Sequence, residues 1–294
     1  MGCEAHGTRF DVQRFGALHK LTSSGLTALY TAEDQRLGRA MSFKLLDDDR
    51  GKDPKALARL EHEARLLARI DHPEVVPLLD IGEVGDEPCL LMGAVGRRSL
   101  RAWLEFGPED AQRLDVLLQV GRGLAAAHRA GVAHCNLGPE RVRVDDRGQA
   151  RLIDFEFGRL LDAEPGAWER DQPNYAGDPR YMAPEARKAG RRDAAADQYS
   201  FCVLAWEALT GRRPPHDPLA AARSSGPRRR AVLTALARGL AIDPSARWPD
   251  VDALVSALER ANSAPRDHLR GPWLTALTIV VVAVMASGLA LAFG

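Results

Sequence analysis

The spacing of apolar residues predicts an amphipathic helix in the N-terminal part of the chain. Asp53 and Pro54 form a start signal, with an N-cap acid and a proline in the first helical position. Apolar residues then recur every three or four positions, at Leu57, Leu60, Ala64 and Leu67. Such spacing places side chains on one helix face. We therefore expect a helix that begins at Pro54 and buries these four side chains.

A continuous apolar run near the C-terminus has a different meaning. Residues 271–294 carry no charged side chain, and residues 273–293 are apolar over a length that spans the hydrocarbon core of a bilayer. A buried helix of a soluble domain is the alternative, but a stretch that is apolar all round leaves no face for water. The sequence predicts one transmembrane helix over 273–293, after a short polar linker over 261–272.

The charges around this run predict its orientation. Arg260, Arg266 and Arg270 precede it, and no basic residue follows. By the positive-inside tendency, the chain is a single-pass protein of the inner or cytoplasmic membrane with its folded part in the cytoplasm. Small residues four apart, such as Ala283 and Ser287, also leave a homodimer open. Such pairs are common in alanine-rich spans, so the dimer is the weaker interpretation.

Composition adds few constraints. The chain has 40 basic and 40 acidic residues, so nothing indicates a nucleic-acid partner. Its four cysteines lack metal-ligand spacing and are typical of reduced thiols in the cytosol. The N-terminus lacks the features of a myristoylation site and of a signal peptide.

Catalytic motifs occur in a recognisable order. Residues 134–141 read HCNLGPER and residues 154–156 read DFE, which resemble the H-R-D-L-x-x-x-N loop and the D-F-G motif of protein kinases. Other landmarks match a V-A-I-K strand, an A-P-E motif and a late D-P-x-x-R-W segment, at residues 41–44, 183–185 and 243–248. Over roughly residues 15–260 the chain resembles the eukaryotic-like Ser/Thr protein kinases of bacteria.

The resemblance implies an α+β, two-lobe protein-kinase-like fold. Residues 1–14 would be an N-terminal extension, 15–95 a small β-rich N-lobe, and 96–260 a larger helical C-lobe. The groups that keep the architecture in this family are present at His134, Phe155, Glu185, Asp197 and Arg247. Of these, Arg247 is expected to pair with Glu185.

The resemblance also implies a nucleotide site with missing parts. Lys44 would anchor phosphates and pair with Glu63, Asp154 would be a metal ligand, and Met92 would lie at the hinge beside an adenine-sized slot. The glycine positions of the phosphate-covering loop fall instead on Thr22, Ser24 and Thr27, which leaves only an extra Gly25. Because side chains keep backbone amides from the phosphates, we expect weak or absent binding of ATP and magnesium. The slot itself could be filled by side chains.

The catalytic loop has lost its reactive groups. Asn136 replaces the catalytic Asp, and an amide is not a general base, a role worth about 10² to 10⁴ in rate. Gly138 replaces a Lys that contacts the transferred phosphate, and Arg141 puts a cation where a metal ligand belongs. Arg141 could replace one metal charge, with Glu156 supplying a new carboxylate. We favour the alternative that Arg141 and Glu156 pair with each other at the surface.

Loop phosphorylation is also expected to be missing. The segment between Asp154 and Glu185 contains no Ser or Thr, and its hydroxyls belong to Tyr175 and Tyr181. The Arg that often clamps a phosphate on this loop is replaced by Cys135.

These patterns keep the scaffold and lose the chemistry. The sequence therefore favours a membrane-anchored pseudokinase that acts as a regulatory or scaffolding module, with a protein partner such as an active kinase or its substrate. An active ATP-dependent Ser/Thr kinase with an atypical catalytic loop is the first alternative. A sensor that binds a nucleotide without transferring phosphate is the second.

Overall fold

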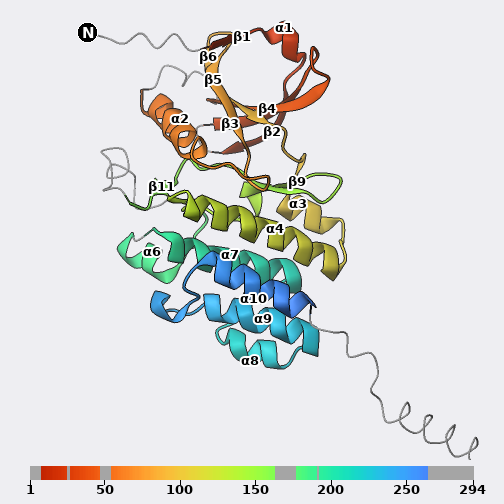
Figure 1. The fold of residues 1–294 in the computed structure, drawn as a ribbon, viewed down its shortest axis with the longest axis vertical. Coiled ribbons are helices and arrows are strands. Elements are labelled where there is room, and N and C mark those ends of the chain that lie inside the picture. Colours follow the sequence, from red (N-terminus) through yellow and green to blue (C-terminus); the bar gives the residue numbers. More distant parts are fainter. Residues whose placement is uncertain (1–7, 25–26, 47–53, 163–176, 191, 264–294) are drawn as a thin grey trace, which may run out of the picture.

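The computed structural model describes residues 8–24, 27–46, 54–162, 177–190 and 192–263. Strands gather at one end of these residues and helices at the other, so the expected α+β, two-lobe kinase-like architecture is confirmed (Figure 1). Gly25, Tyr175 and the predicted transmembrane helix over 273–293 lie outside the described residues. Within the described ranges, no helix combines the length and the apolar character needed to cross a bilayer.

The small lobe contains a six-stranded sheet with the order β1-β5-β6-β4-β3-β2. Its strands are β1 (Thr8–Phe10), β2 (His19–Ser24), β3 (Thr27–Asp34), β4 (Arg39–Leu46), β5 (Leu78–Val84) and β6 (Glu87–Gly93). β1 runs parallel to β5, and the other neighbours are antiparallel. β1 and the short helix α1 (Val12–Phe15) come from the predicted N-terminal extension, so the folded small lobe begins before residue 15.

Aromatic rings form a second, smaller core on this sheet. Phe10 of β1 and Phe15 of α1 pack edge to face, with ring centroids 6.4 Å apart. Phe15 also lies 4.9 Å from the ring of Phe43 in β4. Such contacts between buried rings add to the stabilisation that area burial provides. The segment before residue 15 is therefore held to the sheet by its side chains as well as by β1.

Helix α2 (Pro54–Leu67) begins at the predicted proline. Its buried side chains are Ala56, Leu60, Glu63, Ala64, Leu66 and Leu67. The prediction for Leu57 is wrong, because this side chain is 36% exposed. The inward face is centred near Ala56, Glu63 and Leu67, and successive residues are about 100° apart around a helix, which turns Leu57 outward. The helix orients Glu63 toward the sheet.

The large lobe is built from helices and two small sheets. The helices are α3 (Leu100–Glu105), α4 (Asp110–Arg129), α6 (Pro184–Ala189), α7 (Ala194–Thr210), α8 (Pro218–Arg223), α9 (Pro227–Gly239) and α10 (Val251–Ser263), with 3-10 turns η2 (Pro139–Arg141) and η3 (Pro244–Ala246). The sheets pair β10 (Ala150–Leu152), β9 (Val142–Val144) and β7 (Arg98–Ser99), and β11 (Arg159–Leu160) with β8 (Val132–Ala133).

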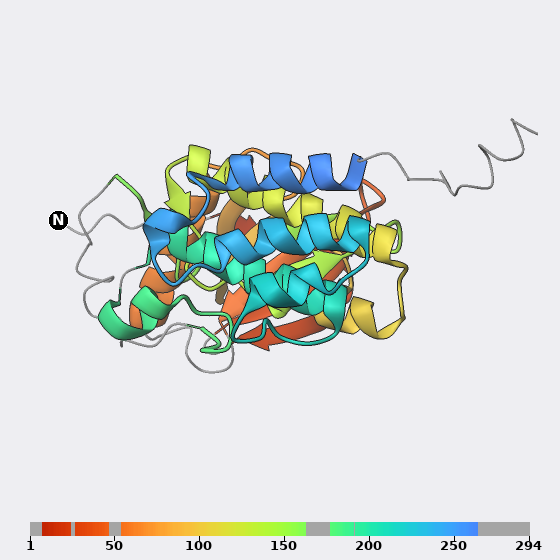
Figure 2. The same cartoon turned by 90° about the horizontal axis from the view of Figure 1, so that it is seen from below.

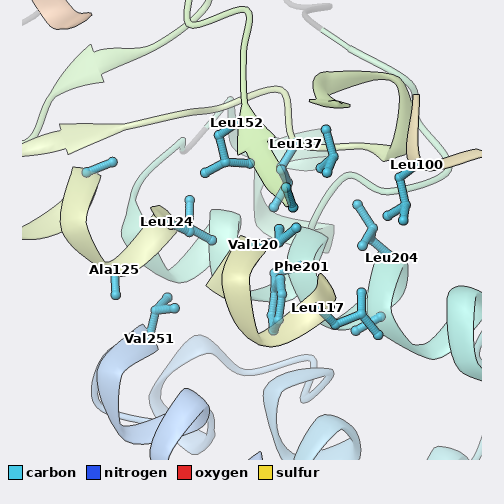
Figure 3. Packing of buried hydrophobic residues seen from close by; sticks show 14 of the residues in the cluster. Leu100, Leu117, Val120, Leu124, Ala125, Leu137, Leu152, Phe201, Leu204 and Val251 are labelled. Carbon is cyan, nitrogen blue, oxygen red and sulfur yellow. The ribbon is translucent and has the colours of Figure 1, made fainter. Parts of the chain in front are cut away.

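The core of this lobe is centred on α4. Leu117, Val120 and Leu124 of α4 belong to one buried cluster with Phe201 of α7 and Val251 of α10 (Figure 3). Seen from below, the helices near the C-terminus, drawn in cyan and blue, cover this face of the lobe (Figure 2). α10 ends at Ser263, so the start of the predicted 261–272 linker is helical.

An ion pair joins two distant parts of the large lobe. The Arg247 guanidinium donates to both carboxylate oxygens of Glu185, at 2.6 and 2.9 Å, which confirms the expected pairing. Arg247 also donates to the Ala195 carbonyl at 2.8 Å. Its side chain is completely buried, and a buried guanidinium is stable only with such partners. The contact fixes α6 against the start of α7.

Candidate functional site

Asp197, in the first turn of α7, holds the catalytic loop from below. Its carboxylate accepts the backbone N–H of His134 at 2.7 Å and that of Cys135 at 2.8 Å. Cys135 has a φ of 63°, a left-handed conformation that is rare for a non-glycine residue. The two hydrogen bonds stabilise that conformation. Above the loop, the Phe155 ring packs on His134, with centroids 4.5 Å apart.

Lys44 lies at the centre of a cluster of buried carboxylates. Its Nζ is 2.5 Å from Glu63 Oε2, 2.5 Å from Asp154 Oδ1 and 3.7 Å from Glu156 Oε2. Glu63 reaches this point from α2 and also accepts the Phe155 N–H at 3.1 Å. The expected Lys44–Glu63 pair is therefore present, and the same ammonium group also binds Asp154.

Arg141 binds the other oxygen of Asp154. Its Nε donates to Asp154 Oδ2 at 3.0 Å, so one carboxylate bridges two cations. Burial alone would raise the pKa of Asp154, but the charges of Lys44 and Arg141 outweigh it and bring the pKa down to about 2. For Lys44, burial favours the neutral form, yet Asp154 and Glu63 raise its pKa above the ordinary value. Asp154 and Lys44 are therefore both ionised at neutral pH, whereas burial raises the pKa of Glu63 above its ordinary value.

Glu156 is buried, which corrects the interpretation that it pairs with Arg141 at the surface. Only 3% of the residue is exposed. Its Oε2 has no hydrogen-bond donor within the described residues, and the ammonium group of Lys44 is 3.7 Å away. Burial, and then repulsion by Asp154, raise the pKa of Glu156 to about 7. Near neutral pH this side chain is therefore divided between its charged and neutral forms.

These carboxylates form a donor set that a divalent cation could use. Glu63, Asp154 and Glu156 each offer one oxygen, and these atoms lie within 4.8 Å of one another. Lys44 is already bound among them, however, and the second oxygen of Asp154 is taken by Arg141. Magnesium needs near-octahedral oxygen ligands and keeps several waters, which two adjacent cations oppose. In this arrangement the residues do not fit a magnesium ion.

A cavity of about 320 Å³ lies between the lobes, so this part of the slot is not filled by side chains. It is lined by Thr22, Ser23, Thr27, Leu29, Lys44, Glu63, Met92, Glu140, Arg141, Ile153 and Asp154. The volume falls at the small end of the range for ligand pockets, about 300 to 1,000 Å³. The structure thus brings the predicted Lys44, Glu63, Met92 and Asp154 to one cavity, which Thr22 and Thr27 at two of the expected glycine positions also line.

Asn136 lies apart from that cavity. It is 7% exposed and borders a recess of about 20 Å³ together with Gly177 and Tyr181. The Gly177 backbone is so close that a Cβ atom there would collide with the Asn136 amide oxygen. The Asn136 amide nitrogen has no hydrogen-bond acceptor within the described part of the chain. The recess has room for one water molecule, not for a substrate side chain.

A polar network beside the catalytic loop was not predicted from the sequence. Arg101 of α3 donates to Glu140 at 2.9 Å and to the Tyr181 hydroxyl at 3.0 Å. That hydroxyl donates to Glu207 of α7 at 2.6 Å. Burial and then Glu207 raise the pKa of Tyr181 to about 12, so the phenol stays neutral. The only sign of this network in the sequence was Glu140, which directly precedes Arg141 in the catalytic-loop motif.

Comparison with known proteins agrees with this geometry. The family model described as "Protein kinase domain" matches residues 18–248, which is well over half of the chain. The chain therefore belongs to the protein kinase domain family, whose members generally use ATP and magnesium.

Its relatives include bacterial Ser/Thr protein kinases. Serine/threonine-protein kinase pkn2 of Myxococcus xanthus is 39% identical over 210 residues, covering 70% of this chain and 25% of that protein. PknL of Mycobacterium tuberculosis is 35% identical over 197 residues, covering 66% and 49%. PknA of the same species is 31% identical over 213 residues, covering 70% and 48%. The chain thus matches between a quarter and about half of the length of these relatives.

The raised pKa of Glu156 predicts a pH dependence of stability. A carboxyl group whose pKa rises from 4.5 to about 7 on folding stabilises the fold below pH 4.5, and this contribution is lost as the pH approaches 7. Glu156→Gln stays neutral throughout. We expect the variant to gain stability over the wild type between about pH 5 and pH 8, by about 1.4 kcal/mol per unit of raised pKa. Urea unfolding at several pH values measures this difference, and a constant difference would contradict the raised pKa.

Proposed function

We propose that this protein is a catalytically impaired pseudokinase, anchored in the membrane, that regulates signalling by presenting its lobe surfaces to a partner protein. The observation that carries the proposal is the contact of Arg141 with Asp154 at 3.0 Å, on the carboxylate that would otherwise hold a metal ion. A guanidinium remains charged in any protein environment. The metal ion that neutralises phosphate charge during transfer is therefore disfavoured at Asp154, which would be its ligand.

The position of Asn136 supports the same proposal. An amide cannot accept the proton of a substrate hydroxyl. The close approach of the Gly177 backbone also leaves that amide 7% exposed. Catalysis by the family's mechanism needs a base within hydrogen-bond reach of the hydroxyl. Asn136 therefore offers neither a basic group nor an exposed side chain to a substrate hydroxyl.

The scaffold remains well supported, which suits a binding role. Asp197 still holds the catalytic loop, and Arg247 still binds Glu185. The proposed partner is an active kinase or one of its substrates, since a kinase-like surface fits proteins that normally meet kinases. A second copy of this chain is a further proposed partner, through the apolar segment. Nothing in the charge balance favours a nucleic acid.

The first test of this proposal is phosphoryl transfer. Purified full-length protein with radiolabelled ATP and magnesium should incorporate no more phosphate than the Lys44→Ala variant, because base and metal ligand are both replaced. Lys44-dependent incorporation would sink the proposal and favour the active Ser/Thr kinase. The double substitution Asn136→Asp with Arg141→Asn should recover little activity if the residues at the expected glycine positions also weaken nucleotide binding. Strong recovery would mean that nucleotide binding was intact.

A nucleotide sensor is the second candidate, and the open cavity of about 320 Å³ favours it. If Arg141 stands in for a metal ion, ATP should raise the melting temperature equally in magnesium and in EDTA, and the shift should vanish in Arg141→Ala. Binding stabilises the folded state by mass action, so a thermal-shift titration measures it. A shift that requires magnesium would exclude this substitution of charge, and no shift in either buffer would exclude the sensor.

The membrane anchor is tested separately. Residues 271–294 should insert with the C-terminus outside, since they carry no charged side chain and follow three arginines. Deleting them should move the protein from the membrane to the soluble fraction. A reporter fused after Gly294 should work only if it functions outside the cytoplasm. A cytoplasmic reporter that is active there, or a full chain that is soluble without detergent, would contradict the anchor.

A further inference from the structure

Two segments lie where the lobes meet, and one hairpin contacts both. The first, residues 72–77, joins α2 to β5 within the small lobe, and the second, residues 94–97, passes from β6 of the small lobe to β7 of the large lobe. Because both lie where the lobes meet, they are called the first and the second crossing. The hairpin of β9 and β10 belongs to the large lobe. Its backbone already holds the first crossing, because Leu152 N donates to Glu74 O at 2.8 Å and Val76 N donates to Leu152 O at 2.9 Å.

Arg143 of β9 holds the second crossing. Its Nε donates to the Gly96 carbonyl at 2.9 Å, and its Nη2 donates to the Arg97 carbonyl. The side chain is nearly buried, with 3% of the residue exposed. Burial lowers the pKa of Arg143 from its ordinary value, but a guanidinium stays charged. Two backbone carbonyls are its partners in that buried position.

Arg151 of β10 binds both crossings at once. It lies opposite Arg143 in the register of the hairpin. Its Nε donates to the Pro73 carbonyl at 3.1 Å in the first crossing, and its Nη1 donates to the Ala94 carbonyl in the second. A planar guanidinium with donors in a fixed fork suits such a bridge, and a lysine cannot reproduce it.

Close backbone packing restricts the second crossing further. A Cβ atom at Gly96 would overlap the backbone of Val144 in β9. A Cβ atom at Gly93 would come within 2.7 Å of the Pro77 ring, and Gly93 N donates to Pro77 O at 2.9 Å. The second crossing is therefore packed against both β9 and the first crossing, and rotation about it requires several contacts to break together.

We propose that Arg143 and Arg151 are positioning residues that lock the angle between the lobes, and with it the opening of the cavity. Hydrogen bonds from a charged donor are about twice as strong as neutral ones, and here they lie on both crossings. Enzymes of this type close and open their two lobes during catalysis, and a fixed angle between the lobes opposes that motion. A fixed interlobe angle suits a module that presents one constant surface. The lock needs no ligand, so its test is independent of the proposed function.

The test compares Arg143→Leu and Arg151→Leu with Arg147→Leu. Arg147 lies in the exposed turn of the same hairpin, where its backbone N–H donates to Asp145 and is kept by the substitution, so this variant is the matched control. Spin labels are introduced as unnatural amino acids at Leu37 and Ile242, which are exposed on the small and the large lobe. Pulsed electron resonance on the full-length chain in detergent then gives the distribution of interlobe distances.

The wild type and Arg147→Leu should show one narrow distribution, and both test variants should show a broader one. Hydrogen exchange should rise at least tenfold in residues 72–77 and 93–99, without change in α7. Arg143→Lys should be intermediate, because it keeps the charge but loses the fork.

A broad wild-type distribution, or test variants whose widths equal that of Arg147→Leu, would overturn the lock. So would an exchange increase spread evenly over the chain, because that pattern indicates general destabilisation. If a Leu variant does not fold, the conservative Arg143→Lys variant decides the question: a width equal to that of the wild type overturns the lock, and a broader one supports it.

Discussion

The structure depends on one carboxylate bound by two cations. Asp154 receives the Lys44 ammonium on one oxygen and the Arg141 guanidinium on the other. Burying charges is costly unless each has a partner, and here Lys44 comes from β4 and Arg141 from the catalytic loop to meet Asp154, which follows β10. The two contacts draw the small lobe, the catalytic loop and the D-F-E segment to one point. The same arrangement occupies the carboxylate that would otherwise bind a metal ion.

Glu156 adds a third acidic side chain to this site. The charges of Lys44 and Arg141 are matched by Asp154 and by the charged form of Glu63, whose pKa burial also raises. Burial of Glu156, and then repulsion by Asp154, raise the pKa of this third carboxyl group to about 7. A glycine at this position, as in the D-F-G motif, adds no charge. The substitution therefore makes the balance of the site sensitive to pH in the physiological range.

The sequence predicted the parts of the site whose distances follow from motif spacing. The Lys44–Glu63 and Glu185–Arg247 pairs were expected, because each residue stands at a fixed place in a known motif. The partner of Arg141 and the burial of Glu156 were not, since spacing does not give the direction of a side chain. Leu57 was misplaced for a related reason: its periodicity was correct, but the inward face is set by the Lys44–Glu63 contact. The close contact of Asn136 with the Gly177 backbone was not predicted either, because Gly177 approaches from a distant part of the chain.

The central claim is that the contact of Arg141 with Asp154 keeps a metal ion from that carboxylate, and manganese binding tests it most directly. Manganese substitutes for magnesium at oxygen sites, and electron resonance of the free ion reports how much is bound. Without nucleotide, because ATP itself binds manganese, the purified protein should bind no manganese below millimolar concentration, and Arg141→Asn should create a site that Asp154→Asn removes. Micromolar binding of one ion by the wild type, lost in Asp154→Asn, would contradict the account.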